Sequence, residues 1–127
     1  MSSGGAVVAD NQRLPGHSLL LADPVVEHLT DLSYGDRSRL LSDMALIEEA
    51  LHACTDAFWG NHEILGNGDA ALHANVFPRF GEEPEQCRRA PVWAYPSEVR
   101  ASESFSPAKH GDLRSRLATY LIHRLNG

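Results

Sequence analysis

Features that mark several special classes of protein are scarce in this chain of 127 residues. It has only two cysteines, Cys54 and Cys87, whose spacing fits no metal site, so we expect reduced thiols in a cytoplasmic protein. It has no apolar run long enough to span a membrane and no signal-peptide pattern, so no membrane partner is expected. The formal net charge of −6 argues against a general nucleic-acid partner, which would need a basic surface.

The composition that remains is that of an ordinary folded domain. Hydrophobic residues make up 43% of the chain and charged residues 22%, which is unlike a disordered protein. A chain of this length supports a single hydrophobic core. We predict one domain over residues 1–127, with its core at 6–80, a long loop at 81–107 and a C-terminal helix at 108–126.

The most informative segment runs from residue 61 to residue 80. Ile64 and Leu65 precede Gly66-Asn67-Gly68-Asp69, which is typical of a tight turn between two strands. Two sets of residues then alternate along the second strand. The first set is Leu72, Ala74 and Val76, and the second is Ala71, His73, Asn75 and Phe77. With a period of two, the first set is predicted to face a core and the second the opposite surface.

Other segments predict the elements that surround this strand. Residues 6–9 and 17–21 are expected to be strands. Ser33 and Asp36 predict the start of a long helix, and the apolar face of this helix is Leu40, Met44, Ile47, Leu51, Cys54 and Phe58. Ser106-Pro107 predicts the start of a second helix. The expected fold is α+β: an antiparallel sheet of about four or five strands packed by one long helix, plus a C-terminal helix.

Two motifs in this chain resemble the histidine-triad proteins. The run Leu72-His73-Ala74-Asn75-Val76-Phe77-Pro78-Arg79, preceded by Leu65-Gly66-Asn67, resembles the family signature, in which three histidines alternate with apolar residues before Pro-Arg. Upstream, Pro15-Gly16-His17 resembles the segment that opens the strand beside the active site. The bacterial branch described as dinucleoside polyphosphate hydrolases is the most similar. Aligned on Pro-Arg, the three triad positions fall on Ala71, His73 and Asn75, so the triad is degenerate.

The resemblance implies a homodimer that acts on a small-molecule nucleotide, without a metal or another cofactor. It assigns His73 as the nucleophile and adds Asn75 and His17 to the catalytic group. The implied nucleotide-binding residues are Asp10, Asn11, Asn61, Asn67 and Arg79, with Asp10 or Asn11 at the ribose. The histidines themselves show no pair with metal-ligand spacing, which agrees with the absence of a predicted metal.

The chemistry of the site follows from the imidazole of His73. A histidine with an ordinary pKa is largely neutral at pH 7, so one ring nitrogen has a lone pair that can attack a nucleotide phosphorus and form a covalent nucleotidyl-histidine. Water then releases the nucleotide, which predicts a hydrolase for dinucleoside polyphosphates or nucleoside phosphoramidates. A nucleotide-binding protein with little turnover and a nucleotidyl transferase are the alternatives. In the long loop, Arg88-Arg89 and Trp93 either contact the nucleotide or anchor the loop.

Overall fold

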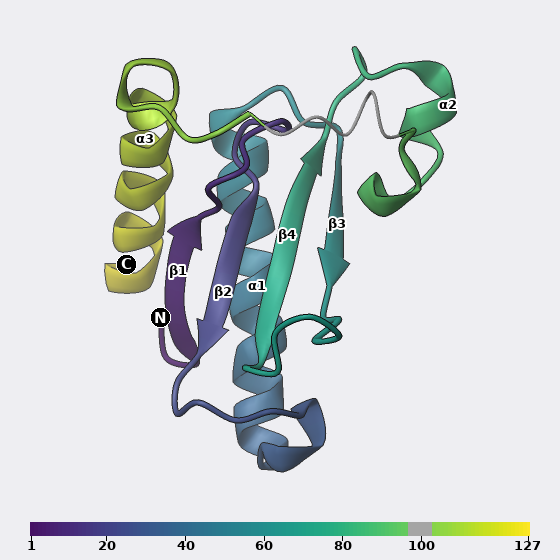
Figure 1. Ribbon diagram of the computed structural model, residues 1–127. Coiled ribbons are helices and arrows are strands. Elements are labelled where there is room, and N and C mark those ends of the chain that lie inside the picture. The colour runs from purple at the N-terminus through teal and green to yellow at the C-terminus, as the bar shows by residue number, and fades with distance from the viewer. Residues whose placement is uncertain (97–102) are drawn as a thin grey trace.

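The computed structural model describes residues 1–96 and 103–127, which form one antiparallel sheet with helices on one face and at one edge (Figure 1). The strands, in the spatial order β1-β2-β4-β3, are β1 (Gly4–Val8), β2 (Ser18–Ala22), β4 (His73–Arg79) and β3 (Trp59–Glu63). The helices are α1 (Tyr34–Cys54), α2 (Glu85–Arg88) and α3 (Pro107–Asn126), with 3₁₀ turns η1 (Leu29–Asp31) and η2 (Val92–Ala94). The predicted α+β fold is confirmed.

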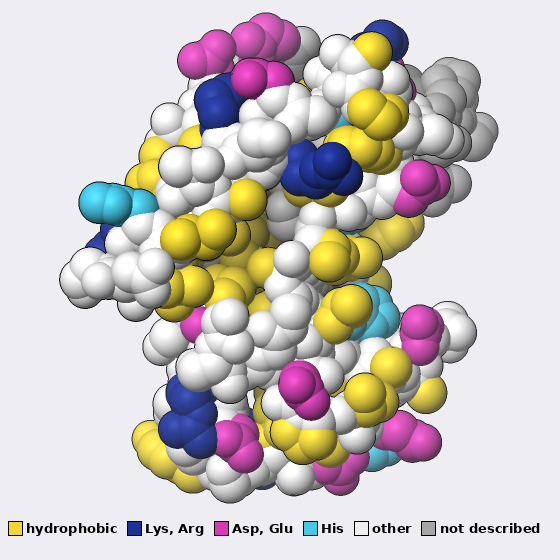
Figure 2. Space-filling view, turned by 90° about the vertical axis from the view of Figure 1, so that its left-hand side faces the viewer, with side chains coloured by type: hydrophobic (Ala, Val, Ile, Leu, Met, Phe, Trp, Pro, Cys, Tyr) yellow, Lys and Arg dark blue, Asp and Glu magenta, His cyan; other side chains and the backbone are white. Residues whose placement is uncertain are grey.

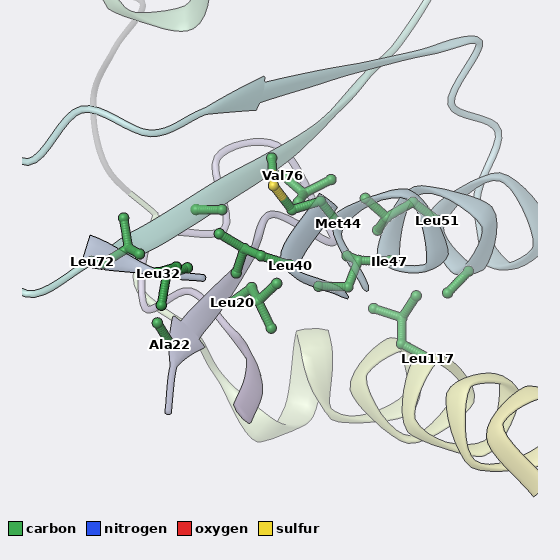
Figure 3. Close-up of a cluster of buried hydrophobic side chains, with 12 residues drawn as sticks. Leu20, Ala22, Leu32, Leu40, Met44, Ile47, Leu51, Leu72, Val76 and Leu117 are labelled. Atoms are coloured by element: carbon green, nitrogen blue, oxygen red, sulfur yellow. The ribbon is translucent and has the colours of Figure 1, made fainter. Parts of the chain in front are cut away.

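Helix α1 packs across one face of the sheet and forms the core with it. The helix begins as predicted, because the Ser33 side chain accepts a hydrogen bond from the backbone N–H of Asp36 at 3.1 Å. Figure 3 shows the apolar side chains of α1, β2 and β4 in contact, with one leucine of α3 beside them. The labelled residues are Leu20, Ala22, Leu32, Leu40, Met44, Ile47, Leu51, Leu72, Val76 and Leu117. Each fully buried leucine or isoleucine stabilises the fold by roughly 1.5–3 kcal/mol.

The strand register decides which residues of β4 face this core. Ala74 and Val76 are fully buried against α1, and Leu72 is 6% exposed just before the strand, as the alternation predicted. His73 and Asn75 therefore lie on the opposite face, which we call the outer face. In Figure 1, α1 lies behind the sheet and α3 lies beside β1, so none of the described helices covers the outer face.

The connection between β3 and β4 differs from the predicted tight hairpin. Strand β3 ends at Glu63, and the chain then forms a longer loop over residues 64–72. Ile64, the first residue after the strand, keeps the alternation, because its side chain packs against the core on the same face as Val76. Gly66 has a φ of 79°, so the left-handed backbone expected in this segment is present.

Three further details correct or extend the sequence reading. Phe58, predicted in the core, is 53% exposed because α1 has already ended at Cys54. The predicted loop at 81–107 contains α2 and η2, and its residues 97–102 lie outside the described part of the chain. Helix α3 is not capped by the Ser106 side chain; instead, the Ser106 backbone N–H donates to Nδ1 of the buried His110 at 2.9 Å.

In the described ranges no helix has the length and apolarity that a membrane crossing requires.

Candidate active site on the outer face

His17 enters the site from a tight turn just before β2. Gly16, which precedes it, has a φ of 103°, a left-handed conformation that suits glycine. The buried Gln12 holds this turn from inside: its Nε2 donates to the carbonyl oxygens of Ala9 at 2.8 Å and His17 at 3.0 Å, and its Oε1 accepts from the Gly16 N–H at 2.9 Å. The backbone of His17 is thereby held in place, and its ring stacks on Phe77 of β4.

His17 and Asn75 form a hydrogen-bonded pair. Nε2 of His17 lies 2.9 Å from Oδ1 of Asn75, and because an amide oxygen only accepts, Nε2 carries the proton. Nδ1 lies 3.3 Å from the carbonyl oxygen of Asn11. Burial lowers the pKa of His17 below its usual 6.5, although the bonds to Asn75 and Asn11 and the charge of Glu63 oppose this. The pair is therefore neutral at pH 7.

The amide nitrogen of Asn75 is the free end of this pair. Among residues 1–96 and 103–127, Asn75 is bonded through its oxygen, to His17. Asn75 is 8% exposed and lies on the outer face of β4, beside His73. Its NH₂ group is thus placed to donate to an oxygen atom of a ligand that lies over His73.

The orientation of His73 is set by the backbone of its own strand. Nδ1 of His73 lies 2.7 Å from the carbonyl oxygen of Ala71, which can only accept, so the proton sits on Nδ1. Nε2 then has a lone pair, and this atom has no hydrogen-bond partner within the described ranges. His73 is half-buried, directly opposite Leu21 of β2. Ala71, predicted at the first triad position, has no polar side chain, and its carbonyl group selects the tautomer of His73.

Aromatic side chains border the pair on the side away from His73. The rings of His17 and Phe77 stack with centroids 4.0 Å apart and planes inclined by 22°, and Trp93 meets Phe77 edge-on at 6.1 Å. The Trp93 indole N–H donates to the carboxylate of Glu63, which lies opposite Asn75 in the sheet. The three rings of His17, Phe77 and Trp93 border a cavity of about 60 Å³. The sequence did not single out Glu63, although its strand alternation with Asn61 was a usable signal.

Arg79 lies at the end of β4 and is 2% exposed. It forms an ion pair with Glu83 at 3.0 Å. It also donates to Oδ1 of Asn61 at 2.7 Å and to the hydroxyl of Tyr95 at 3.0 Å. Further bonds run to the carbonyl oxygens of residues 87 and 90, at 2.7 Å and 2.6 Å. The guanidinium is committed to internal acceptors, and it fastens the segment that carries Trp93 to the sheet.

The remaining predicted binding residues are distributed around this site. Asn11 makes a bridge to Ser104 and accepts from the Glu103 N–H at 3.1 Å, so it connects the site to the start of α3. Asp10 is exposed next to it. Asn67 is exposed in the loop that precedes His73. The structure therefore places His17, Asn75 and His73 together on the outer face. Asn61 and Arg79 are instead hydrogen-bonded to each other.

A second histidine cluster lies on the other face of the sheet. His62 of β3 contacts Glu48 of α1 at 2.5 Å, and His52 contacts the other oxygen of Glu48 at 3.0 Å. The hydrogen bond to Glu48 raises the pKa of His52, with support from the Ala57 carbonyl oxygen. Within the described ranges, no group of at least three His, Cys, Asp or Glu side chains is arranged to hold a metal ion.

Comparison with known proteins identifies the architecture. The sequence matches no protein-family model and no curated protein sequence. A histidine-triad protein from Sinorhizobium meliloti matches in structure with a TM-score of 0.79 and 21% sequence identity, over 94% of this chain and 84% of that one. The chain has the histidine-triad fold. A histidine-triad protein from Bradyrhizobium japonicum matches with a TM-score of 0.78 and 19% identity, over 95% of this chain and 86% of that one.

A third histidine-triad protein, from Marinobacter aquaeolei, matches with a TM-score of 0.77 and 17% identity, over 93% of this chain and 82% of that one. The resemblance predicted from the sequence is thus confirmed for the fold. At these identities the likeness establishes the histidine-triad fold alone, and the function has to follow from the residues of this chain.

Proposed function

We propose that this protein cleaves a nucleoside phosphate compound through a covalent nucleotidyl-histidine at His73. The observation that carries the proposal is the contact of His73 Nδ1 with the Ala71 carbonyl oxygen at 2.7 Å. This contact leaves Nε2 as an unprotonated nucleophile, half-exposed on a face that none of the described helices covers. The neighbouring Asn75 amide supplies a donor for a phosphoryl oxygen.

A nucleotide fits the surroundings of His73. Trp93, which packs edge-on against the buried Phe77, is 53% exposed and offers a surface on which a base can stack. Arg13 lines the small cavity next to His17, Phe77 and Trp93, and it brings a positive charge toward the phosphates of a bound nucleotide. We assign Asp10 and Asn11 to the ribose and Asn67 to the phosphates, while Asn61 and Arg79 position the segment that carries Trp93. Two free cysteines, Cys54 and Cys87, favour a cytoplasmic location.

The test is a single-turnover experiment with diadenosine tetraphosphate, followed by mass spectrometry of the intact and digested protein. An adduct of nucleotide mass on His73, followed by AMP release, is expected for the unaltered protein, and both should be lost in His73→Ala. His62→Ala is the matched control, because it removes a histidine from the opposite face of the sheet. AMP release that persists in His73→Ala would refute the covalent mechanism.

The alternatives are a nucleotide-binding protein with little turnover and a nucleotidyl transferase. The amide of Asn75 favours both, because it can bind a phosphate oxygen but cannot carry a proton to or from the reacting atoms. Binding of diadenosine tetraphosphate without adduct or product would identify the first. Product formation that depends on an added phosphorylated acceptor would identify the second.

We also propose that the protein is a homodimer that associates through the side formed by β1 and α3. Figure 2 shows hydrophobic side chains in a hollow on this side, and a cavity of about 430 Å³ lies there between β1, α1 and α3. Strand β1 is at the edge of the sheet and has unpaired backbone groups. Light scattering should give twice the chain mass of 13.9 kDa. Ala118→Arg, inside the groove, should give monomers, and Thr119→Arg, outside it, should not.

A further inference from the structure

The acid–base groups of the site lead to an inference that rests on the proposed function and concerns its leaving group. When Nε2 of His73 attacks phosphorus, a P–N bond forms, and the bond from phosphorus to the leaving group breaks. The electron pair of the broken bond departs with the leaving group. His73 becomes an imidazolium whose Nδ1 keeps its proton and its hydrogen bond to the Ala71 carbonyl oxygen. A leaving group that is a strong base must receive a proton in this step.

Among residues 1–96 and 103–127, no side chain that could release a proton is hydrogen-bonded to Nε2 of His73. Asn75, the next residue on the outer face, has an amide that donates a hydrogen bond but does not release a proton. His17 keeps the proton of Nε2 in its bond to Asn75 at 2.9 Å, and its other nitrogen faces the Asn11 carbonyl oxygen. Both ring nitrogens of His17 are thus engaged, and its proton is held by Asn75.

The other neighbours of His73, within the described ranges, do not replace this donor. Leu21 lies directly opposite on β2, and Leu19 lies opposite Asn75. On β3, Glu63 lies opposite Asn75, and its carboxylate accepts the indole N–H of Trp93. The residues opposite His73 and Asn75 are therefore two leucines and a glutamate, and the glutamate carboxylate is already bonded to Trp93.

We propose that the site selects substrates whose leaving group departs without protonation, so that phosphates leave and amines do not. A phosphate has a second pKa of about 6 and leaves as a stable anion. Ammonia and alkylamines are strong bases whose conjugate acids have pKa values of about 9–10, so the nitrogen of a phosphoramidate has to be protonated for its P–N bond to break. In the second step, water attacks phosphorus, the electron pair of the P–N bond returns to Nε2, and the proton of water passes to bulk solvent.

The experiment compares diadenosine tetraphosphate with adenosine 5′-phosphoramidate in the unaltered protein, Asn75→His and Asn75→Gln. General acid catalysis contributes on the order of 10²–10⁴ in rate. We therefore expect the unaltered protein to prefer the tetraphosphate by about 10²-fold or more, and Asn75→His to narrow that preference by a similar factor. Asn75→Gln keeps an amide and should keep the preference. Equal rates on both substrates, or an unchanged preference in folded Asn75→His, would overturn the inference.

A second measurement needs no variant. Aryl esters of AMP, whose phenol leaving groups span pKa values of about 5 to about 10, should react at rates that fall steeply as the leaving-group pKa rises. A slope near zero would show that a proton is being supplied and would overturn the inference, with the proposed function intact. Failure to form the His73 adduct with any of these esters would instead overturn the proposed function, and this inference with it.

Discussion

The two histidine clusters on opposite faces of the sheet use the same side chain in opposite ways. On the outer face, His17 is buried and bonded to the neutral amide of Asn75, and burial lowers its pKa below 6.5. On the α1 face, His52 is bonded to the carboxylate of Glu48, which raises its pKa above 6.5. The first cluster is neutral and lies next to His73, the proposed nucleophile, and the second is a pair of histidine–carboxylate contacts, one of which joins β3 to α1.

The difference shows that a histidine acquires its chemistry from its partner and its solvent exposure. For Glu48, burial favours the neutral form, but the hydrogen bonds from His62 and His52 prevail and lower its pKa. Gly60 makes this contact possible, because a Cβ there would lie 2.5 Å from the carboxyl carbon of Glu48. We therefore expect changes in the outer-face cluster to alter catalysis and changes in the α1-face cluster to alter stability.

The largest effect on stability should come from Arg79, which belongs to neither cluster and fastens the segment that carries Trp93 to the sheet. Arg79→Met removes a buried cation and leaves the Glu83 carboxylate, whose side chain is 7% exposed, without its partner. Loss of one member of a buried ion pair costs on the order of 3–5 kcal/mol. Urea unfolding should show this loss, whereas Arg124→Met, which breaks the exposed pair with Glu49, should change stability by less than about 1 kcal/mol. Similar losses in the two variants would contradict the assigned role of Arg79.

The next effect separates the two clusters by activity. His17→Ala should lower kcat on diadenosine tetraphosphate by roughly 10–100-fold, the scale at which a displaced positioning group affects rate, because Asn75 loses the bond that orients its amide. The effect should fall on kcat more than on KM, and His17→Gln should restore part of the rate by donating to Asn75. His62→Ala, on the other face, should stay within about twofold of the unaltered rate. An equal loss in both histidine variants would show a general effect on folding.

A smaller effect should appear when the α1-face cluster is disturbed sterically. Gly60→Ala forces Glu48 away from its position between His62 and His52, and we expect a loss of about 1 kcal/mol, at the low end for overpacking because a glutamate side chain can move. Thermal unfolding of Gly60→Ala measures this loss. The same substitution in a His62→Ala background should cost less, since the contact is already absent.

The smallest effect is on the pH dependence of stability, and its sign should differ between the clusters. The folded protein lowers the pKa of His17, so below about pH 6.5 the unfolded chain binds more protons, and stability falls as the pH drops through this range. The folded protein raises the pKa of His52, so its contribution is complete below about pH 6.5 and is lost as the pH rises through the folded-state pKa. Urea unfolding across this pH range measures both contributions. Relative to the unaltered protein, His17→Gln should lose less stability as the pH falls, and His52→Gln should lose less stability as the pH rises.

The fold was predictable because its elements are specified by local patterns. The spacing of apolar residues predicted α1, and the alternation in 71–77 predicted which side of β4 is buried. The end of β3 at Glu63 was not predictable, since the turn sequence around Gly66 is typical of a tight hairpin whose first strand would continue through Ile64 and Leu65. His73 and Asn75 were identified through a motif and a period of two.

Contacts between segments distant in the sequence were the part of the site that local patterns could not supply. The hydrogen bond from His17 to Asn75 joins residues 58 positions apart, and the bond from Trp93 to Glu63 joins residues 30 positions apart. The internal partners of Arg79 include Tyr95, which comes from the irregular loop. The tautomer of His73 depends on a backbone carbonyl group, which no side-chain motif reveals.

The positions of the two tryptophans give the protein an intrinsic optical signal. Trp93 touches Phe77 at the edge of the site, whereas Trp59 is 62% exposed and lies opposite Arg79. Emission from Trp93 should change in intensity and wavelength when a base stacks at the site, while Trp59 supplies a constant background. With Trp59→Phe, fluorescence titration could follow occupancy of the site in real time without a labelled nucleotide.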